Sequence, residues 1–208
     1  MAVFTPTYPL TLPTATGIRT QNFTLTRAVA VTTSPFTFQT QVHQHQGEFW
    51  QTVISLPPML RANANLWLSF LLQLRGRRGT FKIGDQDAKS ITGAATGTIR
   101  VNGASQTGNQ VALDGFANST SNVFKAGDYI QIGSYLYMVI ENVTSNGSGE
   151  ANVKIEPALR QGIETIADDA TVIYSNTTTL MRLDSNETGW NTDEVSKYGI
   201  SFSASEAL

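Results

Sequence analysis

Two histidines, His43 and His45, stand two positions apart in a segment that reads as a β-strand. Successive side chains of a strand point to opposite faces, so both imidazoles would share one face. Two imidazoles at that spacing can bind one metal ion if other copies of the chain supply further ligands around a symmetry axis. The neighbouring residues are glutamines, with no Asp or Cys close by, and solvated surface histidines are the simpler interpretation. We therefore predict no metal site.

Acidic side chains cluster in three polar segments. Asp85–Asp87 looks like the start of a calcium-binding loop, but Ser90 and Thr96 stand where such a loop needs glycine and glutamate. A turn held by Asx hydrogen bonds is the prediction for this segment. The pairs Asp168–Asp169 and Asp193–Glu194 are predicted to be solvated turn acids, because acidic pairs catalyse hydrolysis only in a defined geometry.

Arginine and tryptophan offer binding chemistry. The cluster of Arg75, Arg77 and Arg78 suits a phosphate or carboxylate, although cations at a helix C-terminus have a structural explanation and interface ion pairs are a second one. Tryptophans can stack on sugars, and only Trp190, in a polar loop, is expected to be exposed. Trp50 and Trp67 are expected to be buried, in a strand and in a helix.

Motifs for catalysis are missing from the sequence. It contains no phosphate-binding glycine loop, no Gly-x-Ser-x-Gly and no histidine pair at helical spacing. The lack of cysteine excludes disulfides, thiolate metal sites and cysteine nucleophiles. We predict a non-enzymatic protein without catalytic, cofactor-binding or metal-binding residues.

The composition favours strands, turns and packed surfaces. Of 208 residues 40% are apolar and only 14% are charged, below the roughly 25% of an average soluble protein. Few charges suit surfaces that pack against other subunits, where charges are costly to desolvate. A net charge of −2 gives no broad attraction to nucleic acid or to anionic membranes. Neither a secretion signal nor an apolar run of about 20 residues is apparent, so no membrane insertion is expected.

The first half of the chain predicts a sheet followed by one helix. Residues 1–20 contain three prolines and are expected to form an extended segment that docks or lies at a sheet edge. Alternating residues predict three strands at 22–32, 36–45 and 49–56, joined as an antiparallel meander. Pro57 and Pro58 open a helix over about 58–75, with Gly76 as its C-cap. Its buried stripe and the apolar residues that widen it are Leu60, Ala64, Trp67, Leu68, Leu71 and Leu74, and Leu66, Phe70 and Leu72. So wide an apolar surface predicts burial by the sheet and by something further, such as a neighbouring subunit.

The second half predicts an inserted β unit and a return to the first sheet. After a strand within 79–85, short strands are expected at 97–101, 110–113, 128–132, 135–143, 151–156 and 170–174. Residues 176–208 alternate again and could pair with the first sheet. The predicted fold is mainly β with one prominent helix. An antiparallel sheet or sandwich of residues 1–85 plus 175–208 packs on the helix, and residues 86–174 form a small barrel or a galectin- or OB-like domain.

Several stretches resemble a family of phage tail proteins found near the tail tip of long-tailed, siphovirus-like phages. The first is Phe49-Trp-Gln-Thr-Val-Ile-Ser-Leu-Pro-Pro-Met59, and a second is Leu74-Arg-Gly-Arg-Arg-Gly-Thr-Phe-Lys-Ile-Gly-Asp85. Further matching stretches are 103–113, 125–133, 143–149, 156–160 and 200–208.

The resemblance implies a distal tail protein or a minor tail protein close to it. In such proteins an N-terminal β domain with one helix forms a hexameric belt around the tail channel, and a second β domain projects outward. The implied partners are copies of the chain itself, the tail tube protein and the tip or baseplate hub proteins, within a virion made in the host bacterial cytoplasm. The leading hypothesis is a structural ring that joins tube to tip.

Two other hypotheses remain open. The inserted domain could bind host surface carbohydrate, which predicts exposed aromatic side chains at Tyr135, Tyr137 and Phe116. An enzyme such as a wall hydrolase is the third, for which the sequence offers no motif.

Overall fold

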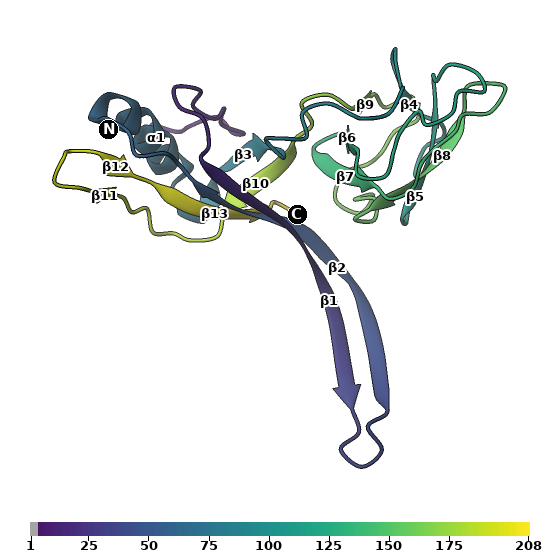
Figure 1. Cartoon of the computed structure of the whole chain (residues 1–208), viewed down its shortest axis with the longest axis horizontal. Coiled ribbons are helices and arrows are strands. Elements are labelled where there is room, and N and C mark those ends of the chain that lie inside the picture. The colour runs from purple at the N-terminus through teal and green to yellow at the C-terminus, as the bar shows by residue number, and fades with distance from the viewer. Residues whose placement is uncertain (1–3) are drawn as a thin grey trace.

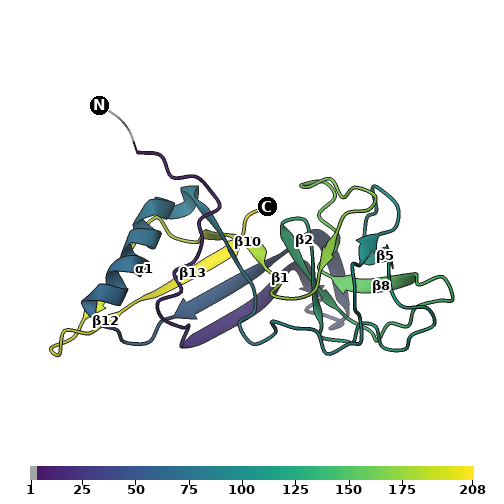
Figure 2. The same cartoon turned by 90° about the horizontal axis from the view of Figure 1, so that it is seen from above.

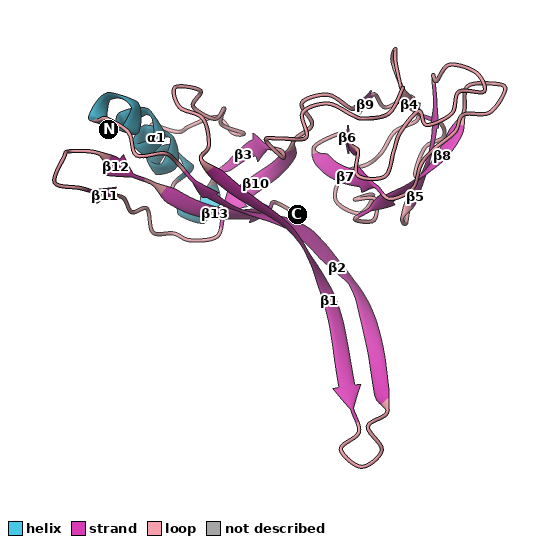
Figure 3. Ribbon diagram, in the orientation of Figure 1, coloured by secondary structure: helices cyan, strands magenta, loops and turns pink. Residues whose placement is uncertain are grey.

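The computed structural model describes residues 4–208, which form two main antiparallel β-sheets and one α-helix (Figures 1 and 3). Strands hold 39% of the residues and helices 8%. The predicted fold class, mainly β with one prominent helix, is therefore confirmed. At one end of the molecule the helix packs on the first sheet, and at the other end stands the second sheet (Figure 2).

The first sheet has five strands in the order β1-β2-β13-β10-β3. These strands are β1 (Thr20–Thr33), β2 (Thr40–Ser55), β3 (Thr80–Ile83), β10 (Thr179–Leu183) and β13 (Ser201–Glu206). Strand β13 lies between β2 and β10, so the C-terminal segment does return to the first sheet. A small hairpin of β11 (Asn191–Thr192) and β12 (Tyr198–Gly199) precedes β13.

The second sheet comprises six strands from the middle of the chain, in the order β4-β5-β8-β7-β6-β9. They are β4 (Arg100–Val101), β5 (Gln110–Asp114), β6 (Tyr129–Ile132), β7 (Tyr135–Val139), β8 (Ala151–Glu156) and β9 (Val172–Ile173). A bridge between Arg100 and Thr171 joins the two end strands, so the sheet is a nearly closed barrel. Gly133, with a φ of 61°, allows a two-residue turn between β6 and β7.

The predicted three-strand meander is wrong. Residues 40–55 form one continuous strand, and β1 with β2 makes a long hairpin instead. The chain does not turn near Gly47, between the second and third predicted strands. Instead, the pairing of β1 with β2 shifts register between Arg27 and Val29, which forms a bulge. Residues 36 and 38, predicted to lie in a strand, belong to the hairpin loop, where Phe38 has a φ of 56°. Residues 28–47, here called the arm, project away from the rest of the molecule (Figure 3).

Helix α1 (Arg61–Leu74) is shorter than the predicted helix at both ends. It begins after Leu60, and the left-handed residue that ends it is Arg75, followed by Gly76 and the short 3-10 helix η1 (Gly76–Arg78). The buried side chains are Ala64, Trp67, Phe70, Leu71 and Leu74. Leu60, expected on the buried stripe, is 65% exposed, because the chain enters the helix only at Arg61.

One face of the five-stranded sheet carries the core. The helix covers one end of this face, where Trp67 and Phe70 contact Phe202 and Phe81 at centroid distances of 6.2 and 5.5 Å. Tyr129, from the barrel, packs at the other end on Trp50, 6.0 Å away. Barrel and sheet therefore share one hydrophobic cluster at their junction, besides the separate cluster inside the barrel. The outer face carries mainly small polar side chains, with Ser201, Ser203 and Ser205 on β13.

The N-terminal segment docks on the helix and on the edge of β3, as predicted, although residues 1–3 lie outside the described part. Leu10 pairs in parallel with Phe81, and its N–H donates to the carbonyl of Thr80 at 2.8 Å. The hydroxyl of Tyr8 donates to the carbonyl of Gln73 in the helix at 2.8 Å. The strand edge at β3 is thus covered. Within residues 4–208 no helix has the length and apolar character needed to cross a membrane.

Candidate functional site

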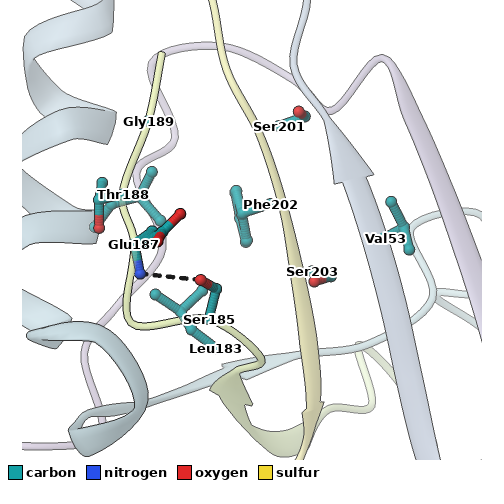
Figure 4. A pocket seen from close by; sticks show the side chains of 10 residues that line it. Val53, Leu183, Ser185, Glu187, Thr188, Gly189, Ser201, Phe202 and Ser203 are labelled. Carbon is teal, nitrogen blue, oxygen red and sulfur yellow. Dashed lines mark hydrogen bonds between the residues drawn. The ribbon is translucent and has the colours of Figure 1, made fainter.

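A hollow between the loop after β10 and strand β13 is the best candidate for a small-molecule site (Figure 4). Its volume is about 330 Å³, at the lower end of the range for ligand pockets. Leu71, Leu183 and Phe202 supply apolar lining, and Glu187 supplies the carboxylate. The N–H of Glu187 donates to the hydroxyl of Ser185 at 2.9 Å. Glu187 is the one ionisable side chain among the lining residues, so the hollow contains no paired acid and base.

Charged side chains meet inside the protein where the two sheets join. The carboxylate of Glu206 accepts hydrogen bonds from the guanidinium of Arg160 at 2.6 Å, the N–H of Trp50 at 3.2 Å and the hydroxyl of Thr179 at 3.1 Å. The Glu206 and Arg160 side chains are 0% and 7% exposed. Burial raises the pKa of Glu206, and the charge of Arg160 and these donors offset part of that rise. Because both side chains are almost fully buried, the cluster serves as a structural junction between the two sheets.

Two further buried polar side chains fasten the segments that enter and leave the barrel. Asp128 accepts hydrogen bonds from the N–H groups of Thr92 and Gly93, at 2.7 and 3.1 Å. Gln131 accepts one from the N–H of Thr178 at 2.8 Å. The sequence pattern did not single out these residues or the Arg160–Glu206 pair. The hydrogen-bond partners named for them lie between 27 and 156 positions away along the chain, beyond the range of local patterns.

His43 and His45 lie on the arm and are both exposed. His43 pairs across the hairpin with Ala30. In residues 4–208, no group of three or more His, Cys, Asp or Glu side chains is close enough together to hold a metal ion.

The aromatic residues proposed for carbohydrate binding are not exposed. Phe116, Tyr135 and Tyr137 are 5%, 5% and 0% exposed and belong to the barrel core. Inward-facing positions of a small barrel are filled by such large side chains. The carbohydrate-binding hypothesis therefore loses the residues on which it rested. Trp190 is 45% exposed, as predicted, whereas Trp50 and Trp67 are buried.

The acidic segments form turns. Asp85 accepts a hydrogen bond from the N–H of Asp87 at 3.0 Å, which confirms the predicted Asx turn. Asp168 accepts one from the N–H of Gly103, and Asp193 accepts one from the N–H of Lys197. The three arginines at the end of the helix do not gather on one site. Their contacts are a bond from Arg75 to the carbonyl of Phe4 and one from the N–H of Arg77 to the side-chain oxygen of Asn186.

The arm is the most unusual surface of the molecule. Every residue from 28 to 47 is exposed except the half-buried Ser34. Cross-strand pairing places Val31 opposite Val42, and Val29, two positions along, lies on the same face. The loop at the tip adds Phe36 and Phe38, which are 92% and 79% exposed. The apolar side chains of the arm therefore meet water instead of a core.

Ion pairs hold the arm at its root. Arg27 contacts Glu156 of the barrel at 3.0 Å and Glu48 across the hairpin at 3.5 Å. The carboxylate of Glu48 also accepts a hydrogen bond from the N–H of Ala158 in the barrel. Hydrogen bonding to Glu156, opposed in part by burial, raises the pKa of Arg27. A cleft of about 670 Å³ lies at this root and is lined by these charged residues and by Arg160. These contacts with the barrel fix the direction of the arm, although the side chains of residues 28–47 are exposed to solvent.

No protein-family model matches the chain, and no curated protein matches it either.

Proposed function

We propose that the protein is a non-enzymatic structural subunit of a bacteriophage tail, and that copies of it form a ring joining the tail tube to the tail tip or baseplate hub. The stretches that resemble tail-tip proteins supply the biological setting. The proposal places the chain in the virion after synthesis in the host cytoplasm, with tube and tip or hub proteins as its other partners. The resemblance implies six copies in the ring.

The arm is the observation that carries the proposal. Residues 28–47 contain no Asp, Glu, Lys or Arg, and Val29, Val31 and Val42 are 47%, 61% and 60% exposed on one face. A two-stranded hairpin alone is at best marginally stable in water, and contiguous exposed apolar surface marks a contact site. A partner that packs on the arm would remove this surface from water.

The total surface area supports the same conclusion. The chain exposes 11656 Å², whereas a compact monomer of 22.5 kDa is expected to expose about 9,500 Å². The excess is therefore about 2,200 Å². A standard interface buries about 800 Å² on each partner, so a subunit with two neighbours in a ring buries about 1,600 Å². The excess surface is large enough for both contacts.

The helix contributes a second apolar side chain that the chain itself does not cover. Leu66 is 51% exposed beside the N-terminal segment. Arm and helix lie on different parts of the molecule (Figure 1). A contact between two different surfaces is heterologous, and such contacts close into rings when the rotation between copies allows it.

The mass of the purified protein in solution tests the proposal. Light scattering and negative-stain electron microscopy across a concentration series should show closed rings. A variant in which residues 30–43 are replaced by an Asn-Gly turn should stay monomeric, because it lacks the exposed apolar face. Its circular dichroism should keep the signal of the remaining sheets, since the arm contributes nothing to either core.

A strict monomer at high concentration, with no gain in mass on mixing with tail tube protein, would contradict the proposal. Ring formation by the shortened variant would refute the role of the arm. Carbohydrate binding is not favoured as a second function, since its three candidate aromatics are buried.

A further inference from the structure

The arm ends in two phenylalanines that the chain itself cannot cover. Phe36 and Phe38 are 92% and 79% exposed at the tip of a hairpin whose root is clamped to the barrel. Beyond that root the strands extend by roughly 20 Å before the loop, and they point away from the helix (Figure 1). Burial of these rings therefore requires a second molecule.

A groove between the N-terminal segment and helix α1 is chemically matched to such a tip. It has a volume of about 410 Å³, and none of its nine lining residues is charged. Leu10 and Pro13 line it from the N-terminal segment, and Leu66 and Phe70 line it from the helix. Leu66 is 51% exposed there, so the groove leaves apolar surface in contact with water.

The other two hollows described above are less suitable for a phenyl ring. Glu187 lines the one beside β13, and Arg27, Glu48, Glu156 and Arg160 line the cleft at the arm root. An apolar ring placed against these groups would strip water from charges without giving them a partner, which is costly. The uncharged groove has no such cost.

We propose that Phe36 and Phe38 of one copy dock into the groove between the N-terminal segment and helix α1 of a second copy. The inference rests on the proposed function and specifies the contact that builds the ring. Each copy offers a tip at one place and a groove at another, so each copy binds one neighbour and is bound by another. An aromatic side chain buries about 150–250 Å², so two rings and the adjacent strand faces approach the 800 Å² or so of a standard interface.

Complementary variants test this contact. Phe36→Ser with Phe38→Ser removes the tip and leaves the groove intact. Leu66→Glu puts a charge at the groove and keeps helix propensity, because glutamate is a good helix former. Each should weaken self-association, the tip variant by about a hundredfold or more. Leu72→Glu is the matched control, since Leu72 is 57% exposed on the same helix and does not line the groove.

Mixing the tip variant (Phe36→Ser with Phe38→Ser) with the groove variant (Leu66→Glu) gives the decisive result. The intact tip of one can enter the intact groove of the other, but the remaining tip and groove are both defective. Sedimentation or mass photometry should show a one-to-one dimer and nothing larger. Formation of that dimer also shows that both variants are folded.

Engineered cysteines give a second measurement, because the chain has none of its own. With Thr37→Cys, which keeps both tip rings, and Ser69→Cys in one chain, oxidation should link copies into covalent oligomers, since Ser69 lines the groove. Three results would contradict the proposed contact without contradicting the ring. They are normal assembly of the Leu66→Glu variant, loss of assembly in the Leu72→Glu variant, and an assembled ring that forms no cross-link. A monomeric wild type would overturn the proposed function itself.

Discussion

Replacing Glu206 with alanine would remove a carboxylate that joins the five-stranded sheet to the barrel. Its partner Arg160 would stay buried with no counter-charge, because the two side chains are 0% and 7% exposed. The Nε atom of Arg160 already has no hydrogen-bond partner in the described structure. Leaving one charge of a buried pair unpaired costs about 3–5 kcal/mol, and Arg160→Ala should cost a similar amount.

The loss should appear as a large fall in melting temperature. For a chain of about 200 residues, 1 kcal/mol corresponds to roughly 2–4 °C, so each single variant should melt about 6–20 °C lower. Replacing both partners with apolar residues, Glu206→Leu with Arg160→Met, removes both charges together. The N–H of Trp50 and the hydroxyl of Thr179 still lose their acceptor, so the double variant should recover only part of the loss.

Urea denaturation followed by tryptophan fluorescence measures these free energies. The indole N–H of Trp50 donates to the carbonyl of Leu136 in the barrel at 2.9 Å, so this fluorophore reports on the junction. The double variant should be at least about 2 kcal/mol more stable than the sum of the single losses predicts. Additive losses, or single losses below about 1 kcal/mol, would refute the buried pair as the link between sheet and barrel.

Three further outcomes follow from individual side chains. Burial, with a smaller contribution from Asp85, raises the pKa of Tyr129 to about 12. The folded chain keeps this proton where the unfolded chain loses it, so its stabilisation is complete below about pH 10 and disappears as the pH rises through the folded pKa. Tyr129→Phe should flatten this alkaline loss in denaturation curves, and an unchanged slope would contradict the assignment. Gly84→Ala would place a Cβ 1.9 Å from the carbonyl oxygen of Thr177 and should cost about 2–3 kcal/mol, whereas Gly162→Ala, which meets open space, should stay within about 0.5 kcal/mol. Arg27→Ala removes both ion pairs at the arm root, in which the arginine side chain is 45% exposed, so stability should change by less than about 1 kcal/mol. Amide hydrogen exchange at the arm root should nevertheless become faster, and equal exchange rates would count against the clamp.

Local patterns in the sequence predicted the elements that local chemistry determines. The strands predicted at 128–132 and 135–143 leave only Gly133 and Ser134 between them, and the structure has Ile132 paired with Tyr135 across this tight turn. Three- and four-residue spacing located the helix, with Trp67, Leu71 and Leu74 buried as expected. The return of the C-terminal segment to the first sheet was also found, because strand alternation resumes there. Such signals do not depend on which distant segment becomes the partner.

The buried polar links were out of reach for the same reason. Nothing near Glu206 in the sequence distinguishes it from a surface acid. Its role comes from Arg160, 46 positions away, and from Trp50, 156 positions away. The exposure expected for Tyr135 and Tyr137 under the carbohydrate-binding hypothesis was wrong for a related reason. The sequence of an aromatic strand is the same whether the barrel encloses its side chains or leaves them exposed. Burial depends on how the sheet curls, and the bridge between Arg100 and Thr171 brings its two end strands together.

The projecting arm was not predicted, although the composition of residues 28–47 indicates an unusual segment. Alternation at residues 36–45 predicted a strand, and a strand is normally assumed to pack one face on a core. The absence of charge from residues 28–47 argued against a solvated face, yet the alternating segments were assigned to a meander. An apolar, uncharged hairpin is costly to expose, and the chain neither folds it back nor shields it. In the ring proposed above, a neighbouring copy would cover these twenty residues and offset that cost, which local patterns in the sequence of one chain do not reveal.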